Sequence, residues 1–314
     1  MKTVKDFLWT PDMKVESLVD SFGELGYQAI ELNKASDVVM KMKQEGAKIF
    51  LTFTSNMVTS GLRGFFAQLI KLGVVDVVVT TSASIEEDII KALGDNVEIT
   101  SFHADDIHMR EKGENRIGNL LIRNESYMKF EDKMSEFLAI IYAKKKRIDV
   151  SELLKEFGLL LDDENSILYQ AARKNVPIFC PGIADSAIGF HLYMFQQKHE
   201  DFIVDVIRDV KNAVFASNYD EKKGLISLGG GMSKHYAVFS GLLSGGFDYV
   251  VYLTTSHESS GSMSGATTRE AMSWGKVKDT AQAAMVNGDV TITFPLVMIR
   301  AMEKLKKQGI LKDE

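Results

Sequence analysis

Short apolar runs alternate with amphipathic segments along most of the chain. Six runs have the length and apolar character of buried strands, at residues 49–54, 74–80, 177–180, 225–228, 249–254 and 290–294. Strands of this kind that are separated by helical segments pair in parallel, because each connection must cross a face of the sheet. The pattern therefore predicts an α/β fold with a doubly wound, mostly parallel sheet and helices on both faces.

Segments with the spacing of amphipathic helices lie between these runs. They fall at 14–32, with an interruption at Gly26, and at 33–44, 61–72, 85–93, 128–142, 150–161, 166–174 and 236–243. Pro295 is expected to open a C-terminal helix at its first turn, and residues 97–125 are expected to be irregular. With only four prolines and no Ser/Pro-rich linker, residues 1–314 are predicted to form a single domain.

Composition argues against several classes of protein. The chain has 314 residues, of which 45% are hydrophobic and 25% charged, as in ordinary globular proteins. No apolar run approaches the roughly 20 residues that span a bilayer, and the N-terminus has no signal-peptide pattern, so we expect a cytoplasmic protein without membrane association. The single cysteine, Cys180, excludes an intramolecular disulfide. A net charge of −6 argues against general nucleic-acid binding.

Polar residues and glycines collect where the predicted strands end. Because the carboxyl ends of parallel strands share one edge of a sheet, these residues are expected to line a nucleotide or dinucleotide cleft. They are Ser55, Asn56, Thr81, Glu87, Asp185, Gly229 to Gly231, Thr255 and Asp289. The acids at 86–88 also have a structural explanation, since carboxylates in the first turn of a helix are favourable against its macrodipole.

Three consecutive glycines, Gly229 to Gly231, join a predicted strand to a predicted helix. Glycines at such a place let backbone N–H groups close on a phosphate, although the run matches neither G-x-G-x-x-G nor the Walker A motif. A tight turn without a ligand explains the run equally well. His235, just beyond it, is a candidate general base or substrate-binding group, or a satisfied turn histidine.

Three other features are notable by residue type only. The segment HADDIH at 103–108 contains potential metal ligands but lacks helical histidine spacing, so no metal site is predicted. Four basic residues at 144–147 are expected at a solvated helix end, with partner docking as the alternative. Cys180 precedes Pro181, and without a recognisable Cys-His arrangement we interpret it as a small buried residue.

The segment from Gly261 to Lys276, GSMSGATTREAMSWGK, contains the strongest candidate nucleophile. Lysine amines become nucleophilic where apolar surroundings lower their pKa. Trp274 is expected to supply such a surface and a face for a cationic substrate. Gly275 is expected to let a ligand approach the backbone. The alternative is a core tryptophan beside a solvated Lys276.

Seven segments together resemble the deoxyhypusine synthase family, in the order that the family has and over nearly the whole chain. They are FTSNMVTSGLRGFFAQLI, TTSASIEEDIIKALG, RIGNLLIRNESYMKFED, NSILYQAARKNVPIFCPGIAD, LGGGMSKHY, GSMSGATTREAMSWGKVK and NGDVTITFPL. The resemblance implies a Rossmann-like NAD-binding fold. It also implies an archaeal or bacterial type of chain, because the N-terminal extension of eukaryotic members is absent.

The resemblance implies a transferase reaction with NAD as cofactor and spermidine as donor. NAD takes a hydride from spermidine, an enzyme lysine displaces 1,3-diaminopropane, and the 4-aminobutyl group stays on the enzyme as an imine. The group then passes to a lysine of translation initiation factor 5A, where reduction yields deoxyhypusine. A nucleophilic lysine is required because amine exchange through imines needs a neutral amine.

Matched residue by residue, the resemblance places the nucleophile at Lys276, within SWGK. Trp274 is expected along the polyamine, with Glu270 and His235 binding its amines. The NAD-binding residues implied are Ser55, Asn56, Thr59, Thr81, Glu87, Asp185, Gly229, Gly231, Thr255, Ser264 and Asp289. Family members are homotetramers with active sites between paired subunits, and the same assembly is expected here.

Three positions in the polyamine pocket depart from the family pattern. Eukaryotic members have aspartates where this chain has Met263 and Phe190, and an asparagine stands where it has Phe239. The family's TTAGG is TTSAS at 80–84. Loss of an anionic partner for a spermidine ammonium costs on the order of 1.5–3 kcal/mol, or about ten- to a hundredfold in affinity. Archaeal members tolerate a hydrophobic residue at the position of Met263.

Three functions follow from these observations. The first is deoxyhypusine synthase activity. The second is that of a paralogue that keeps NAD and Lys276 but acts on another amine, for example in homospermidine synthesis. The third is that of a catalytically silent NAD-binding subunit, against which the intact Lys276, Trp274, Glu270 and His235 argue. The sequence leaves the donor amine and the acceptor protein open.

Overall fold

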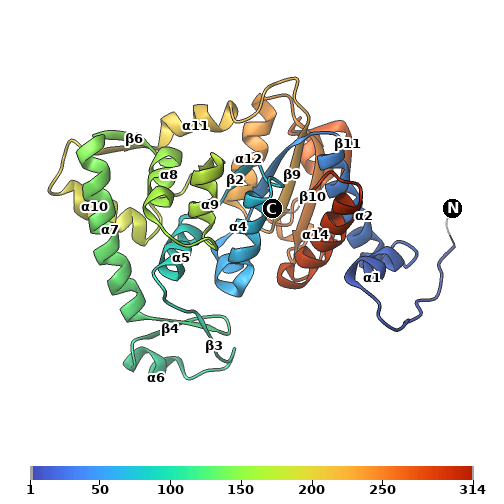
Figure 1. Cartoon of the computed structure of the whole chain (residues 1–314), viewed down its shortest axis with the longest axis horizontal. Helices are drawn as coiled ribbons and strands as arrows, with labels where there is room; N and C mark the ends of the chain where they lie inside the picture. The colour runs from blue at the N-terminus through green and yellow to red at the C-terminus, as the bar shows by residue number, and fades with distance from the viewer. Residues whose placement is uncertain (1–2, 313–314) are drawn as a thin grey trace. The chain divides into compact units, whose positions relative to one another are not determined.

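A parallel sheet lies at the centre of the first of two units into which the chain divides (Figure 1). Five strands of the sheet belong to this unit. They are β1 (Lys48–Thr52), β2 (Val77–Val79), β9 (Lys223–Leu228), β10 (Phe247–Thr254) and β11 (Val277–Asn287), in the order β11-β10-β9-β1-β2. The computed structural model describes residues 3–312. The first unit comprises three segments: the residues up to Phe53, residues Leu72–Val79, and the residues from Val210 onward. The α/β fold predicted from the alternating runs is confirmed.

The parallel register places the carboxyl ends of these strands at one edge of the sheet. Residues paired near that edge are Thr52 with Ser227, Leu228 with Leu253, and Thr254 with Asn287. The polar segments that follow β9, β10 and β11 therefore begin side by side.

Helices cover both faces of this sheet. The helices α1 (Val15–Phe22), α2 (Tyr27–Gln44) and α14 (Val290–Lys307) pack against one another on one side (Figure 1). On the other side lies α12 (Met232–Leu243), which packs on β1, β2, β10 and β11. The short helices η2 (Glu258–Ser260) and α13 (Thr268–Ser273) lie in the connection between β10 and β11.

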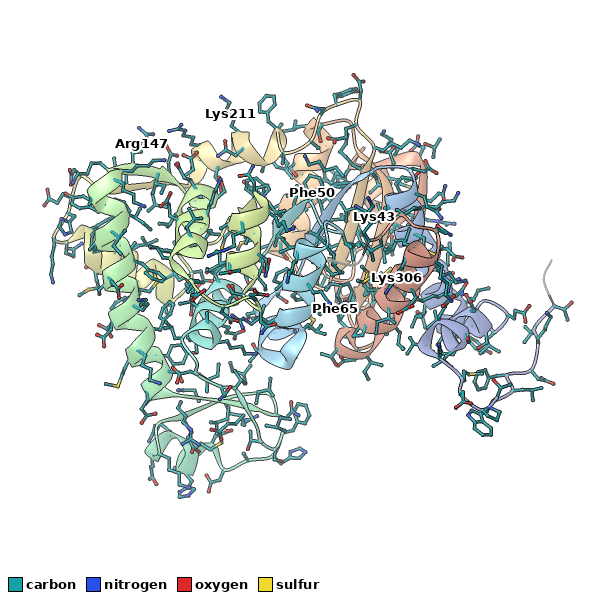
Figure 2. All side chains as sticks on the ribbon, viewed as in Figure 1. Lys43, Phe50, Phe65, Arg147, Lys211 and Lys306 are labelled. Carbon is teal, nitrogen blue, oxygen red and sulfur yellow. The ribbon has the colours of Figure 1, made fainter. Side chains whose placement is uncertain are left out.

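Close packing between the sheet and these helices depends on aromatic and very small residues. Phe50, labelled in Figure 2, lies in β1. Its ring meets that of Phe247 in β10 edge to face, with centroids 5.4 Å apart. Gly224 in β9 allows α2 to approach, because a Cβ there would lie 2.6 Å from the sulfur of Met42. A side chain at position 224 would therefore separate α2 from the sheet.

The second unit comprises residues 54–71 and 80–209 and is mostly helical. Its helices are α3 (Ser55–Met57), the π-helical turn η1 (Val58–Leu62), α4 (Arg63–Lys71), α5 (Ser82–Ala92), α6 (Asp106–Glu111), α7 (Asn124–Lys144), α8 (Val150–Leu160), α9 (Ile167–Lys174) and α10 (Ala187–Gln196). Its strands are β3 (Glu98–Ile99), β4 (Glu114–Ile117), β5 (Leu120–Arg123), β6 (Arg147–Asp149), β7 (Ile178–Phe179) and β8 (Ile203–Asp205). Helix α11 (Val206–Val214) contains the boundary between the two units, at Val210. The prediction that residues 1–314 form a single domain stays a prediction.

Residues 97–125 are ordered as a small antiparallel sheet, so the prediction of an irregular segment is wrong. The strands β3, β5 and β4 pair in that order, and α6 lies between β3 and β4 in the chain. Asp105 begins α6 by accepting hydrogen bonds from the backbone N–H groups of Ile107 and His108, and Asp106 pairs with Arg116. Among residues 3–312, no group of three or more His, Cys, Asp or Glu side chains is placed to hold a metal ion.

The C-terminal part of the chain also differs from its prediction. Residues 290–294 begin α14 rather than forming a strand, and Pro295 lies inside the helix instead of opening it. The side chain of Asp289 accepts a 2.8 Å hydrogen bond from the N–H of Thr291, which starts the helix before the β-branched residues. The cap thus overrides their strand propensity.

Two helix boundaries lie earlier or later than predicted. The interruption expected at Gly26 spans residues 23–26, so that α2 begins at Tyr27. Helix α5 begins at Ser82 rather than at Ile85, which places the acids at 86–88 beyond its first turn. The macrodipole explanation for these acids is therefore wrong.

The remaining sequence features have local explanations. Helix α7 ends at Lys144, and the basic residues that follow pair with acids, as Arg147 does with Asp205 at 2.5 Å (Figure 2). Cys180 is buried, and burial raises the pKa of its thiol to about 12, which suits a packing role. Within residues 3–312, no helix is both long and apolar enough to cross a membrane.

Candidate active site

A cavity of about 230 Å³ in the first unit brings together the four residues predicted to be catalytic. His235 comes from the first turn of α12, Glu270 from α13, and Trp274 and Lys276 from the segment between α13 and β11. The other lining residues are Lys234, Tyr252, Met263, Ala266, Thr267 and Ala271. The geometry therefore unites two motifs, LGGGMSKHY and SWGK, that are about 40 residues apart in the chain.

The amine of Lys276 faces this cavity without a hydrogen-bonding partner among residues 3–312. Its side chain is 9% exposed, and its Nζ lies 5.1 Å from the ring centroid of Trp274. The aromatic ring therefore bounds one side of a mostly buried amine, and Nζ of Lys276 is accessible to a ligand from the cavity. Trp274 itself is 66% exposed, so its other face is open to a ligand.

The Trp-Gly-Lys sequence is explained by the way in which α13 ends. Gly275 has φ of 66°, and its N–H bonds to the carbonyl of Met272 while the N–H of Lys276 bonds to that of Ala271. This pair of bonds is a Schellman motif, which requires a left-handed residue at the position of Gly275. The glycine terminates the helix and directs Lys276 into β11. The expectation that Gly275 also lets a ligand approach the backbone stays a prediction.

Lys234 is a second lysine of the same cavity that the motif reasoning did not select. Its side chain is 1% exposed, and its Nζ donates hydrogen bonds to the carbonyls of Met263 at 3.0 Å and Ala266 at 2.7 Å. Burial lowers the pKa of Lys234 to about 8, while the charge of Glu270 opposes that shift. These bonds hold the GSMSGA loop against α12. The amine of Lys234 is thus engaged, whereas that of Lys276 is free.

Tyr252, in the middle of β10, was also missed. Its hydroxyl is buried and has no hydrogen-bonding partner among the described residues, and the ring lies 3.8 Å from Nζ of Lys234. Burial raises the pKa of Tyr252 above its usual range, so the hydroxyl stays protonated. A buried, unpaired hydroxyl at a cavity wall indicates a polar ligand there. A tyrosine within an apolar strand carries no sequence signal of this role.

His235 is held neutral near physiological pH. Burial lowers the pKa of His235, and the charge of Lys276 lowers it further. The ring is nearly parallel to that of Phe239, with an interplanar angle of 8° and centroids 6.5 Å apart. A neutral imidazole can accept a hydrogen bond from a substrate ammonium. Met263 is an apolar lining residue of the cavity, whereas Phe239 contacts His235 and is not among the lining residues.

Five of the eleven residues predicted to bind NAD belong to the first unit. They are Gly229, Gly231, Thr255, Ser264 and Asp289. Gly229 follows β9 with φ of 58°, and neither it nor Gly231 has an atom within 4 Å of where a Cβ would stand. The bare backbone at the start of the 12-residue α12 is the kind of cradle that binds phosphate groups. The observed residues therefore fit the diphosphate of a dinucleotide.

Thr255 and Asp289 lie at the same edge of the sheet. The carbonyl of Thr254 accepts the N–H of Gly288 at 3.0 Å, which joins the ends of β10 and β11. Asp289 caps α14, as described above, and is exposed. Its carboxylate thus has a structural role that does not depend on a ligand.

The other six predicted NAD residues gather around the N-terminus of α5 in the second unit. They are Ser55, Asn56, Thr59, Thr81, Glu87 and Asp185. The hydroxyl of Thr59 donates to Glu87 at 2.5 Å, and the carbonyl of Asp185 accepts a long hydrogen bond of 3.4 Å from Ser82. Thr81 is the residue before α5. Burial raises the pKa of Glu87 to about 7.

The three consecutive acids of α5 each anchor a different element. Glu86 accepts the N–H of Ala187 at the start of α10, and Glu87 accepts from Thr59 in η1. Asp88, fully buried, accepts from the hydroxyl of Ser166 at 2.8 Å and from two backbone N–H groups of α9. These contacts explain the acidic run better than a helix dipole does.

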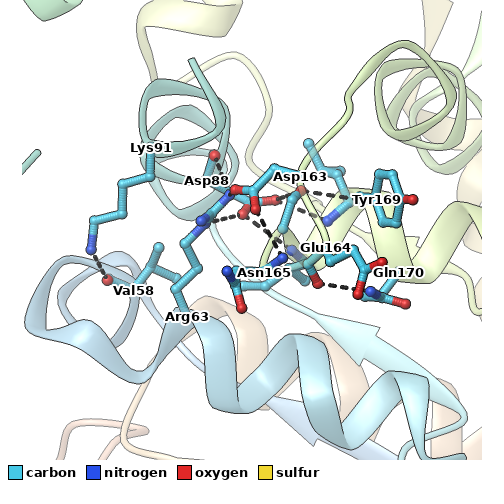
Figure 3. Close-up of polar contacts among 12 residues, drawn as sticks. Val58, Arg63, Asp88, Lys91, Asp163, Glu164, Asn165, Tyr169 and Gln170 are labelled. Atoms are coloured by element: carbon cyan, nitrogen blue, oxygen red, sulfur yellow. Dashed lines mark hydrogen bonds and ion pairs between the residues drawn. The ribbon is translucent and has the colours of Figure 1, made fainter. Parts of the chain in front are cut away.

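Arg63 completes the network around Asp88 (Figure 3). Its Nε lies 2.5 Å from Asp88, and its Nη2 lies 2.6 Å from Asp163. Because Arg63 directly follows η1, this buried pair ties the predicted NAD segment to α5 and α9. Arg63 was not singled out by the sequence, and Asp88 was considered only as a member of the acidic run at 86–88.

Comparison with known proteins shows the family to which the chain belongs. The family model described as deoxyhypusine synthase matches residues 17–301. A protein of Thermoplasma acidophilum, named "Probable deoxyhypusine synthase", is 37% identical over 95% of this chain and 96% of its own length. The chain belongs to the deoxyhypusine synthase family. A relative from Schizosaccharomyces pombe with the same name is 35% identical over 94% of this chain and 89% of its own.

Solved structures agree on the fold of this deoxyhypusine synthase family member. A candidate deoxyhypusine synthase from Entamoeba histolytica has a TM-score of 0.65 at 24% identity, covering 95% of this chain and 96% of that one. AgrE, solved as a ternary complex with ornithine and NAD+, has a TM-score of 0.54 at 12% identity over 89% of this chain and 34% of its own. At these identities the likeness concerns the fold.

Proposed function

We propose that this chain transfers the 4-aminobutyl group of spermidine to a lysine of translation initiation factor 5A in an NAD-dependent reaction. The observation that carries the proposal is the amine of Lys276, which is buried beside Trp274 in a cavity that also contains Glu270 and His235. Family membership and the names of the relatives support the reaction class.

The lysine exchange follows from the chemistry of the cavity. NAD, when bound, would supply the redox chemistry: it would take a hydride from spermidine as the first imine forms and return that hydride to the imine on the acceptor lysine, which gives the secondary amine of deoxyhypusine. Nζ of Lys276 then attacks the imine carbon, the bond from that carbon to the departing nitrogen breaks, and 1,3-diaminopropane leaves with the two hydrogens that Nζ of Lys276 gives up. The acceptor lysine repeats the exchange at the same carbon and releases Lys276.

The surrounding side chains bind and orient the polyamine. Glu270 is the acid that faces the cavity, and we assign it to an ammonium of the donor. Trp274 offers a face to the cationic chain. His235, held neutral, accepts a hydrogen bond or a proton from the amine undergoing exchange. The buried hydroxyl of Tyr252 supplies a further polar contact.

The resemblance implies NAD-binding residues in each of the two units. In the first unit the glycine turn and the start of α12 suit the diphosphate. In the second unit the carboxylate of Glu87 suits a ribose hydroxyl. NAD+ in the AgrE complex supports use of this cofactor by a related fold. We further propose a homotetramer and a cytoplasmic location, as for the family.

The deciding experiment incubates the pure protein with NAD, spermidine and the initiation factor 5A of its own organism, and then weighs the factor. A mass gain of one aminobutyl group, absent when NAD or spermidine is omitted, is the expected result. An unmodified factor in the presence of both would refute the proposal.

A second candidate function is aminobutyl transfer to or from a different amine, including homospermidine synthesis. The specific observation that favours it is the apolar side chain of Met263, which lines the cavity at a position where eukaryotic family members have an acid. Phe190 lies in α10 of the second unit, where it is 57% exposed. If the factor gains no mass while homospermidine or another amine product accumulates, the second function replaces the first.

A further inference from the structure

A groove of about 770 Å³ lies in the first unit, apart from the Lys276 cavity. One wall is the exposed face of α2, with Lys34, Asp37, Lys41 and Gln44, and the other is α13 together with residues 281–283 of β11. A volume of this size is typical of sites for small molecules or cofactors. None of its lining residues belongs to the predicted catalytic or NAD set.

The groove carries an excess of unpaired positive charge. Among residues 3–312, neither Lys41 nor Arg269 makes a hydrogen bond or ion pair through its side chain, although the charge of Lys41 acts on the carboxylate of Glu45 one turn further along. Lys34 is 3.8 Å from Glu31, a weak contact. The one acid of the lining, Asp37, is already paired with Arg300 at 2.7 Å. Three cations therefore face the groove in a chain whose net charge is −6.

The shape of the groove matches an elongated anion with an apolar part. Lys34 and Lys41 are seven residues apart on one helix face, which corresponds to about 10 Å along the axis. Between and opposite them, the methionines at 40 and 272 and the small side chains of Ala281 and Ala283 line the groove. Such a surface accommodates a flat, less polar group while the cations bind phosphates.

Helix α13 separates this groove from the Lys276 cavity. Its residues Thr268, Arg269 and Met272 line the groove, whereas Glu270 lines the cavity, as does Trp274 just beyond the helix. A helix of six residues presents both faces at once. Any ligand that draws Arg269 towards α2 must therefore act on the element that positions Glu270 and Trp274.

We propose that this groove binds an elongated phosphate-bearing ligand of nucleotide size and that its occupancy alters the position of α13. The ligand class is set by the three cations and by the length and apolar floor of the groove. The inference goes beyond the proposed function, since it concerns a second site whose binding is measurable whether or not the aminobutyl transfer takes place.

Calorimetric titration with ATP and with inorganic tripolyphosphate tests binding, first without NAD and then with NAD present. Saturable one-to-one binding per chain is expected, with ATP the tighter of the two because of the apolar floor. The double variant with Lys41→Ala and Arg269→Ala should bind at least tenfold more weakly. The matched control carries Lys112→Ala and Lys198→Ala, two exposed cations outside the groove that change the net charge equally. It should bind as the parent does.

Tryptophan fluorescence tests the effect on α13. The chain has two tryptophans, Trp9 and Trp274, so Trp9→Phe leaves Trp274 as the only reporter. Tripolyphosphate, which does not absorb, should change its emission with the same midpoint as the calorimetric binding. A change that persists after Arg269→Ala would separate the signal from the groove and contradict the proposal.

Three results would overturn the inference. One is the absence of saturable binding, as expected if a second copy of the chain covers the groove. Another is equal binding by the groove variant and the control. The third is binding without any response of Trp274. None of these results depends on whether initiation factor 5A gains mass, so the two proposals fail independently.

Discussion

The hydroxyl of Thr59 donates a 2.5 Å hydrogen bond to the carboxylate of Glu87, and both side chains are buried. Burial raises the pKa of Glu87 from 4.5 to about 7, while this bond and the charge of Lys91 oppose the rise. The carboxyl group therefore titrates near neutral pH at a place where we expect the cofactor. Its charge state links stability and cofactor binding to pH.

Glu87→Gln should stabilise the protein at alkaline pH. The folded chain holds the Glu87 proton up to about pH 7 and the unfolded chain only up to about 4.5, so the free energy of unfolding falls as pH rises through this window. A pKa rise of this size corresponds to a loss of about 3 kcal/mol in the free energy of unfolding between the two ends of the window. Urea unfolding should show the variant more stable at pH 8 and equal to the parent near pH 4.

The exposed Glu200→Gln serves as the control, and it should change stability little at either pH. If Glu87→Gln changes the free energy of unfolding by the same amount at pH 4 and pH 8, Glu87 does not titrate between these pH values in the folded chain.

Removal of Asp88 should be the most damaging single change in the second unit. Asp88→Ala leaves the buried guanidinium of Arg63 without its main partner and two N–H groups of α9 without an acceptor. Breaking such a pair costs about 3–5 kcal/mol in the free energy of unfolding. Asp163→Ala is the matched control, because it removes the more exposed partner of Arg63 and should cost about 1 kcal/mol. Equal losses in chemical unfolding would show that Asp88 is not the centre of the network.

Lys276→Arg should abolish the covalent adduct and leave NAD affinity near that of the parent. Arginine keeps the positive charge but has no neutral amine with which to form an imine. Borohydride trapping with spermidine and NAD, followed by peptide mass analysis, locates the adduct. In Lys234→Met the adduct should remain on Lys276, because Lys234 donates to two carbonyls and is not free. An adduct found on Lys234 would reverse the assignment.

Asp289→Ala should weaken NAD binding, and a second variant separates two explanations. The alanine removes both the carboxylate and the cap of α14, whose loss costs about 1 kcal/mol in stability. Asp289→Ser keeps a capping oxygen but no charge. Weak NAD binding by both variants supports a direct contact with the cofactor. Normal binding by the serine variant would reduce the role of Asp289 to the cap.

Met263→Asp should lower the KM for spermidine about tenfold or more if the pocket is a spermidine site. The new carboxylate would meet a donor ammonium at a position where eukaryotic family members have an acid, and one such contact contributes about 1.5–3 kcal/mol. Met263→Asn provides the neutral control of similar size and should have a smaller effect. A higher KM for the aspartate variant would show that the apolar wall suits a less charged donor.

The sequence by itself determined the alternation of strands and helices, and with it the α/β class, because the burial of parallel strands needs continuous apolar runs. It also selected Lys276, through a motif specific to one family. Local caps were harder to predict. Asp289 caps a helix at residues whose composition favours a strand. Residues 97–125 pair as antiparallel strands although their apolar and polar positions do not alternate regularly.

Only the tertiary structure decided which side chains share a cavity. Lys234 and Tyr252 become part of the candidate site because α12, α13 and β10 converge, and neither residue differs by type from ordinary core or surface positions. The same holds for the anchoring role of Asp88 and for the cationic groove behind α13. Side-chain partners depend on the packing of distant elements, and a linear pattern contains no direct record of that packing.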